Sequence, residues 1–184
     1  MEFFVERCAK KLRIRISILI CLRTASSQMK KYFLKLYQYN AWANQRVIST
    51  LTRQSVNDEK ILTLMGHIVA AQFLWLHRIK GLPPAKVKLW GEYTLEKVTE
   101  MADEAGKLWL DFVEANEEFD RELTYTNYVG DPYVNNVESI MMHLVNHSSY
   151  HRAQIAMLLR QKGFEPINTD FITYDRVMRG QLKG

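Results

Sequence analysis

Residues 141–159 read MMHLVNHSSYHRAQIAMLL, and this helical stretch carries three of the five histidines of the chain at four-residue intervals. Side chains four apart in an α-helix lie on one face, with Cβ atoms about 5–6 Å apart, so neighbouring imidazoles can converge on one metal ion. His143 and His151 are separated by roughly 12 Å along the helix axis, whereas a transition metal lies about 2 Å from each ligand nitrogen. One ion can therefore use His143 with His147, or His147 with His151.

A third ligand has to come from another segment, and His67 is the best placed candidate. It lies in LTLMGHIVAAQFLWLHRIKG, residues 62–81, where Leu64, His67, Ala71 and Leu74 form a largely apolar stripe at helical spacing. A histidine on a stripe that faces the core points inward. We therefore expect His67 to meet the histidines of residues 141–159.

The spacing of apolar residues predicts an all-α chain with four long amphipathic helices, at about residues 31–51, 55–81, 94–119 and 136–163. The second is expected to begin near Ser55, whose S-x-x-D pattern with Asp58 is a capping-box signal, and Asn136 is expected to cap the fourth. Between the third and fourth, LTYTNYVGDPYV (residues 123–134) predicts a short β-hairpin or an irregular loop. Such helices imply a four-helix bundle, in which metal sites are built from inward side chains of facing helices.

The composition fits one globular domain and gives no sign of nucleic-acid binding. The chain has 184 residues, 47% of them hydrophobic, and a formal net charge of +5. Residues 1–28 hold six Lys and Arg against two Glu and so carry +4 of this charge, while the remaining 19 basic residues face 18 acidic ones. The body is therefore nearly neutral, and a basic face able to neutralise many phosphates is not expected.

The first 28 residues differ in character from the rest. Their apolar run ISILICL has seven residues, whereas a membrane span needs about 20, and no A-x-A cleavage site follows it as in a secretory signal. We predict that residues 1–28 are a start-site artefact or a tail, with an ordered extra helix as the alternative, and that residues 29–184 form the bundle. A cytoplasmic protein without a membrane segment is expected.

Both cysteines, Cys8 and Cys21, lie in this first segment. A disulfide framework, a cysteine-containing zinc site and a cysteine nucleophile are therefore excluded for the body. A zincin-type protease is disfavoured, because H-E-x-x-H needs a glutamate directly after its first histidine, and Leu144 and Ser148 stand at these positions. The four tryptophans are expected to be core and interface anchors: Trp42, Trp75, Trp90 and Trp109.

Four segments resemble the damage-inducible DinB/YfiT-like family. The most specific is HLVNHSSYHRAQI (143–155), which is similar to a family helix containing N-H-x-x-x-H-R-[GA]-Q; the others are MGHIVAAQFLWLHRIKG (65–81), YNAWANQRV (39–47) and GFEPINTDFITY (163–174). The resemblance covers residues 29–184 and implies a four-helix bundle that holds one divalent metal ion by three histidines. By motif position these are His67, His147 and His151, which leaves His143 as a neighbouring residue of the core or one that supports the ligands.

The resemblance implies a range of activities: thiol-dependent S-transferases, an isomerase that uses a low-molecular-weight thiol, and metal-dependent hydrolases. Three neutral imidazoles suit zinc or nickel, which we favour, and also iron(II) or manganese. We expect a metal-dependent enzyme with a small-molecule substrate, in the first place a transferase that activates a low-molecular-weight thiol. The alternatives are a metal-dependent hydrolase and a non-catalytic, stress-associated metal-binding bundle that acts through dimerisation. A homodimer is expected.

Four further residues are candidate helpers of such a site. Tyr150 can donate a hydrogen bond, Arg152 can hold an anionic group, Gln154 can orient a bound water, and Asp170 can act as a base or fix a histidine tautomer. The structural interpretations are packing for Tyr150, an ion pair between Arg152 and Asp170, and a backbone partner for Gln154. Gln72 stands where relatives carry an acidic residue, which argues against a carboxylate-assisted mechanism.

Overall fold

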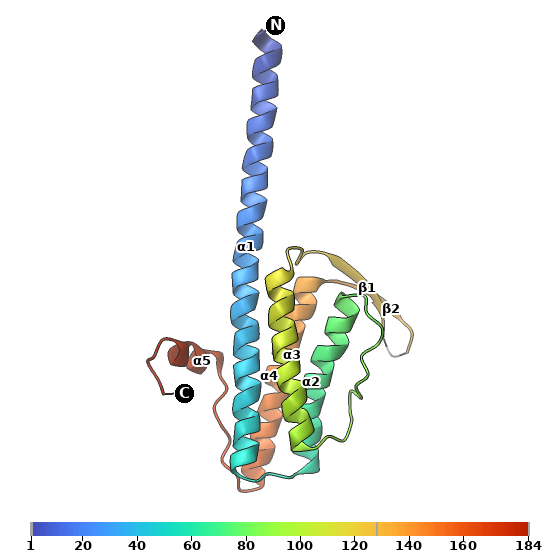
Figure 1. Cartoon of the computed structure of the whole chain (residues 1–184), viewed down its shortest axis with the longest axis vertical. Coiled ribbons are helices and arrows are strands. Elements are labelled where there is room, and N and C mark those ends of the chain that lie inside the picture. The colour runs from blue at the N-terminus through green and yellow to red at the C-terminus, as the bar shows by residue number, and fades with distance from the viewer. Residues whose placement is uncertain (1, 128, 184) are drawn as a thin grey trace.

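Four of the helices pack side by side into a bundle (Figure 1). The computed structural model describes the backbone of residues 2–127 and 129–183, and the side chains from residue 26 onward within these ranges. Its elements are α1 (Glu2–Arg53), α2 (Glu59–Ile79), α3 (Leu95–Ala115), β1 (Glu122–Thr126), β2 (Pro132–Asn136), α4 (Val137–Gln161) and α5 (Phe171–Met178). The predicted helical bundle with a hairpin before its last long helix is confirmed.

The order of the helices around the bundle decides how the chain connects them. α1 packs against α3 and α4, and α2 packs against the same two helices. α1 and α4 run in one direction along the bundle and α2 and α3 in the other, as the colours of Figure 1 show. Because the consecutive helices α2 and α3 are parallel, residues 80–94 have to return along the length of the bundle. We call this segment the return loop.

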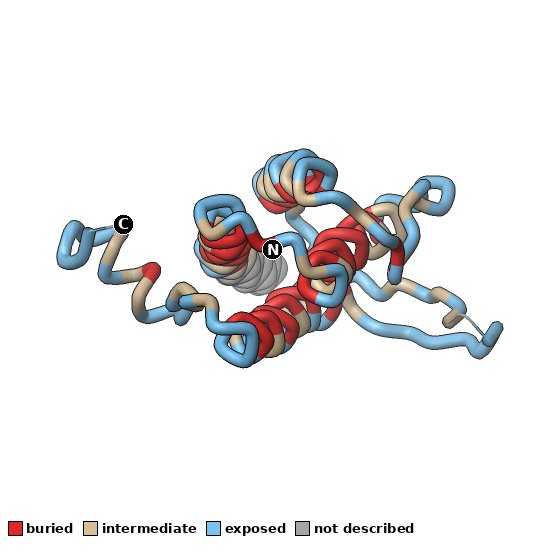
Figure 2. The backbone as a smooth tube through the Cα atoms, turned by 90° about the horizontal axis from the view of Figure 1, so that it is seen from below, coloured by how far each residue is buried: buried red, intermediate tan, exposed pale blue. Residues whose placement is uncertain are grey.

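Buried residues lie on the inner faces of the four long helices, as the colouring of the backbone in Figure 2 shows. Trp109 of α3 is among the largest of them and is 1% exposed. Its ring stacks on Tyr37 of α1 at a centroid distance of 4.7 Å, and its Nε1 donates a hydrogen bond of 3.2 Å to the carbonyl of Gln72 on α2. The prediction that Trp109 anchors the core is confirmed, and this one side chain ties three helices together.

One of the two predicted caps, Asn136, is confirmed, and the third helix opens at Thr94 as its predicted range has it. The side chains of Thr94 and Asn136 cap α3 and α4, and each accepts a hydrogen bond from a backbone N–H three residues further on. α2 begins after Asp58, which accepts a hydrogen bond of 3.0 Å from the N–H of Ile61. Ser55 instead has φ 51° in the turn that ends α1, so the prediction that it begins the second helix is wrong.

Two features of the helices differ from the predicted four. α1 does not begin near residue 31 but continues through residues 2–28 and projects beyond the bundle (Figure 1). Its packing reaches back to Ser26, whose Oγ donates a hydrogen bond of 3.0 Å to the carbonyl of Glu117, and Lys30 pairs with the carboxylate of the same Glu117. α5 is a short helix beside α1 that the apolar spacing did not predict. None of the helices in the described part of the chain combines the length and the apolar character that a membrane span requires.

Candidate metal centre

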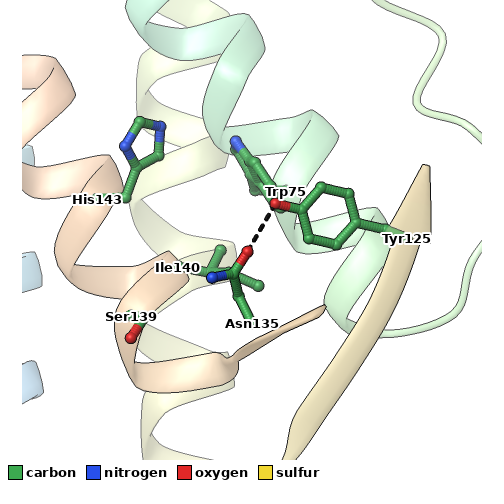
Figure 3. Close-up of a pocket in the computed structure, with 6 residues that line it drawn as sticks. All are labelled: Trp75, Tyr125, Asn135, Ser139, Ile140 and His143. Atoms are coloured by element: carbon green, nitrogen blue, oxygen red, sulfur yellow. Dashed lines mark hydrogen bonds between the residues drawn. The ribbon is translucent and has the colours of Figure 1, made fainter. Parts of the chain in front are cut away.

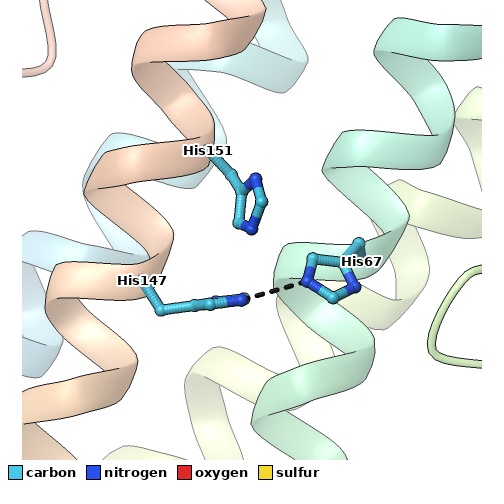
Figure 4. A group of neighbouring side chains, drawn as sticks. All are labelled: His67, His147 and His151. Carbon is cyan, nitrogen blue, oxygen red and sulfur yellow. Dashed lines mark hydrogen bonds between the residues drawn. The ribbon is translucent and has the colours of Figure 1, made fainter.

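Three imidazoles meet between α2 and α4, one from α2 and two from α4 (Figure 4). His67 and His151 are 4% and 8% exposed, and His147 is half-buried. The ring centroids of His67 and His147 lie 4.9 Å apart, and that of His151 lies 4.8 Å from the first and 4.5 Å from the second. One nitrogen of each ring lies within 4.8 Å of the other two. We call these three residues the histidine cluster.

Hydrogen bonds orient two of the three rings. His67 Nδ1 lies 2.9 Å from the carbonyl oxygen of Leu89, and His151 Nδ1 lies 2.7 Å from Oε1 of Gln154. Since both partners are acceptors, each Nδ1 carries the proton and donates it, which leaves the lone pair on Nε2 in a neutral ring. The Nε2 atoms of His67 and His147 face each other at 3.0 Å. This arrangement, with Nδ1 held from outside and Nε2 turned inward, is typical of histidines that bind metals.

The return loop reaches His67 because α2 has a glycine beside it. A Cβ on Gly66 would lie 2.4 Å from a ring carbon of Tyr93, so only glycine leaves room for this ring against the helix. The Tyr93 hydroxyl in turn donates a hydrogen bond of 2.8 Å to the carbonyl of Lys88. The loop held in this way places the Leu89 carbonyl at His67 Nδ1 and stacks Trp90 on the His67 ring at a centroid distance of 3.6 Å.

The surroundings disfavour the protonated forms of His147 and His67. Burial, followed by the charges that His151, His67 and His143 would carry, lowers the pKa of His147 to about 3. Burial also lowers the pKa of His67, an effect that the hydrogen bond to Leu89 opposes and the neighbouring His151 reinforces. A neutral imidazole is the form that binds a metal ion, because protonation occupies the lone pair.

The donor set fits one divalent transition-metal ion. Two nitrogens that are each about 2.0–2.1 Å from a tetrahedral ion lie about 3.3 Å from one another, close to the 3.0 Å between the Nε2 atoms of His67 and His147. His147 Nδ1 is buried without a hydrogen-bond partner, unlike the Nδ1 atoms of His67 and His151. A cluster able to hold a metal ion is therefore present, and it joins His67 to the pair His147 and His151.

The other residues predicted for the site lie around the cluster or away from it. The His143 ring lies one helical turn before His147 on α4, with the two ring centroids 5.5 Å apart. Tyr150 is exposed and meets His151 edge-on at 5.2 Å. Asp170 is exposed at the start of α5, where it accepts a hydrogen bond from Asn168. Gln154 and the return loop, rather than Asp170, hold the Nδ1 atoms of the cluster.

Arg152, next to His151, points away from the cluster into the interface of α4 with α1. It is 2% exposed, and one guanidinium nitrogen donates hydrogen bonds of 2.8 Å to the side-chain oxygens of Asn40 and Asn44. The other donates to the hydroxyls of Tyr39 at 3.2 Å and Ser149 at 2.9 Å. Arg152 therefore binds residues of the YNAWANQRV segment. The prediction of an ion pair between Arg152 and Asp170 is wrong, because Asp170 instead pairs with Asn168.

Sequence reasoning missed the residues that the return loop supplies. Trp90 was expected to be a core or interface anchor, but it is 59% exposed and stacks on His67. Leu89 contacts His67 through its backbone carbonyl, and because every residue has this group, the sequence could not indicate the contact. The available signal was Gly66, since a glycine inside a helical pattern often marks the close approach of another segment.

The fold and the site together define a class of protein, namely helical bundles with a three-histidine cluster between two of their helices. The chain belongs to the DinB family, whose family model matches residues 27–181. It is 25% identical over 163 residues to the protein DinB of Bacillus subtilis (strain 168), an alignment that covers 79% of this chain and 95% of that protein. The crystal structure of a DinB-like protein from Bacillus cereus ATCC 10987 has a similar fold, with a TM-score of 0.60 at 18% identity, covering 74% of this chain and 94% of that one.

The lowered pKa of His147 makes the metal-free protein less stable in acid. In the unfolded chain this ring takes up a proton near pH 6.5, but in the folded chain only near pH 3. Between these values the unfolded state binds more protons, so the free energy of unfolding falls as the pH falls, by at most about 1.4 kcal/mol per pH unit and less for a partly exposed ring. We expect urea unfolding of chelator-treated protein at pH 7.5, 6, 5 and 4 to show this loss. His147→Leu should flatten the dependence, and an unchanged slope in that variant would contradict the prediction.

Proposed function

We propose that the histidine cluster binds one divalent metal ion, zinc or nickel in the first place, and that the protein is a thiol-dependent S-transferase. The observation that carries the proposal is the convergence of three imidazoles, of which His67 and His151 have Nδ1 held by acceptors outside the cluster. Three protein ligands leave a coordination position for a thiol or water, the pattern of catalytic rather than structural sites. A bound ion would supply Lewis acidity and favour the deprotonated form of that ligand.

The residues around the cluster favour a thiol over water as the nucleophile. A metal-activated water commonly needs a carboxylate as general base, and the one group of close potential ligands in the described part of the chain contains only histidines. Gln72 was predicted to stand where relatives carry an acidic residue. It is buried, and its side-chain amide donates a hydrogen bond to the carbonyl of Ile68 on its own helix. A thiol needs no such base, because coordination alone deprotonates it. Both cysteines lie in residues 1–28, so the thiol is proposed to be a small external molecule.

The transferase reaction can be tested with a thiol and an activated aryl chloride. In this reaction the thiolate sulfur forms a bond to the ring carbon, and the chloride leaves with the electron pair of the broken bond. Zinc-loaded or nickel-loaded protein should accelerate the loss of cysteine or glutathione by at least about 100-fold over the uncatalysed rate. Chelation should abolish the acceleration and return of the metal should restore it.

Two controls separate the alternatives. His67→Ala should be inactive, while His77→Ala, a histidine of the same helix that lies outside the cluster, should retain activity. Hydrolysis of an ester without any thiol would favour the hydrolase instead. A full complement of tightly held metal without turnover of either kind would overturn the enzymatic proposal and favour a non-catalytic metal-binding bundle.

A further inference from the structure

A small pocket lies beside the histidine cluster, between α2, α4 and the hairpin (Figure 3). Its volume is about 250 Å³, and its lining consists of Trp75, Tyr125, Asn135, Ser139, Ile140 and His143. Ile140 is buried, while Trp75 and Tyr125 are half-buried and the other three residues are exposed at the rim. The pocket is therefore open to solvent at its rim and has an apolar floor.

Three aromatic rings from three different elements surround this pocket. Trp75 meets Tyr125 edge-on at a centroid distance of 5.0 Å and an angle of 81°, and it meets His143 at 6.1 Å and 70°. These edge-on arrangements do not stack the three rings on one another, whereas Tyr125 stacks on Tyr133, outside the lining, at 6.0 Å and 27°. A flat ligand is therefore expected to use the ring faces of Trp75 and His143. The hydroxyl of Tyr125 donates a hydrogen bond of 2.8 Å to Oδ1 of Asn135, as Figure 3 shows, so its own oxygen can still accept one.

The hairpin that contributes Tyr125 is fixed to α2 by an arginine. The Arg78 guanidinium lies over the rings of Trp75, at 4.9 Å, and Tyr125, at 5.2 Å. It also donates a hydrogen bond of 3.2 Å to the carbonyl of Thr126. These contacts hold the two aromatic walls in place without a ligand, and such preorganisation lowers the entropic cost of binding.

His143 connects this pocket to the cluster. Its ring lines the pocket and also lies 5.5 Å from the ring of His147. We propose that the pocket binds the flat, aromatic part of the substrate, which carries a hydrogen-bonding substituent and has its reacting atoms at the histidine cluster. The last part of this assignment rests on the proposed metal centre. The volume of about 250 Å³ lies just below the range of about 300–1,000 Å³ that is typical of small-molecule sites, which suits a small ligand such as a single substituted ring.

Phenol and cyclohexanol form a matched pair of probes, since both carry one hydroxyl on a six-membered ring and only phenol has an aromatic face. We expect phenol to shift the NMR signals of the backbone amides of Asn135, Ser139 and His143, with a dissociation constant of about 1–10 mM for so small a ligand. Cyclohexanol should bind at least about fivefold more weakly. Equal binding of the two probes, or no phenol shift at these amides, would overturn the proposal.

Variants locate the binding and separate it from the metal centre. Trp75→Leu and Tyr125→Leu should each weaken phenol binding at least about fivefold, and Tyr125 is on the hairpin, so its loss leaves the bundle core intact. Trp42→Leu, on α1 and outside the lining, should bind as the wild type does, and equal loss in all three variants would overturn the proposal. If the protein bound phenol but took up no zinc, the proposal of an aromatic-binding pocket would stand and only the proposed metal centre would be refuted.

Discussion

His67→Ala and His151→Ala should each lower the metal content from about one ion per chain to nearly none after dialysis. Each change removes one of three converging nitrogens, and the two that remain cannot complete a site for zinc or nickel, so affinity should fall by more than about 100-fold. His67 and His151 lie on different helices, and loss in both variants would establish that the ion bridges α2 and α4. Inductively coupled plasma mass spectrometry of protein loaded with zinc or nickel measures this directly.

His77→Ala is the matched control for this experiment. His77 lies on α2, and its Nδ1 approaches the carbonyl of Pro83 at 2.7 Å instead of the cluster. This variant should keep its metal. If His67→Ala retained the ion, or if folded wild-type protein refused added zinc, nickel and manganese, the three imidazoles would have to be core residues and the proposed function would fail.

Arg152→Met should lower the free energy of unfolding by about 3 kcal/mol. The change removes hydrogen bonds from a charged donor to four side chains and leaves the buried oxygens of Asn40 and Asn44 without this donor. The loss should be smaller than the sum of these bonds, because the fold also no longer has to bury a positive charge, which is the cause of the lowered pKa of Arg152. Urea unfolding at pH 7.5 measures the difference.

Arg160→Met serves as the control, since Arg160 is an exposed arginine of the same helix. Its replacement should change stability by less than about 0.5 kcal/mol. A similarly small effect of Arg152→Met would mean that the hydrogen bonds to α1 only offset the cost of burying the charge. Arg152→Lys should recover little stability, because an ammonium group cannot reproduce the planar set of donors that reaches both asparagines.

Local signals in the sequence predicted those parts of the fold that local physics decides. Apolar spacing predicted the long helices, and the predicted cap at Asn136 is confirmed because a side chain that accepts a hydrogen bond from its own helix needs no other partner. The prediction for Ser55 was wrong because both Ser55 and Asp58 are residue types that can cap a helix. Only the backbone conformation decides which of the two is the N-cap, and here it is Asp58. α5 was missed because a helix of eight residues has too few turns to show a period.

The candidate site was predictable only in part. The four-residue spacing allowed two ligand pairs, His143 with His147 or His147 with His151. The structure brings His67 to His147 and His151 because α2 packs against α4 at their level, and the packing of two helices cannot be predicted from spacing within one of them. Arg152 shows the same limit. Its charge indicated an anion or a carboxylate as partner, whereas the fold supplies amide and hydroxyl oxygens from a helix more than a hundred residues away in the chain.

The parallel course of α2 and α3 sets a minimum length for the return loop. α2 has 21 residues, which corresponds to about 31 Å at 1.5 Å per residue, and the loop has to cover a similar distance with the fifteen residues 80–94. Fully extended, fifteen residues reach about 50 Å, so the slack is equivalent to only a few residues. Shortening this segment by more than that would pull Tyr93 off Gly66 and the carbonyl of Leu89 off His67. The return loop therefore needs a minimum length. Deletions within it beyond a few residues should disturb the histidine cluster, although none of the three histidines lies in the loop.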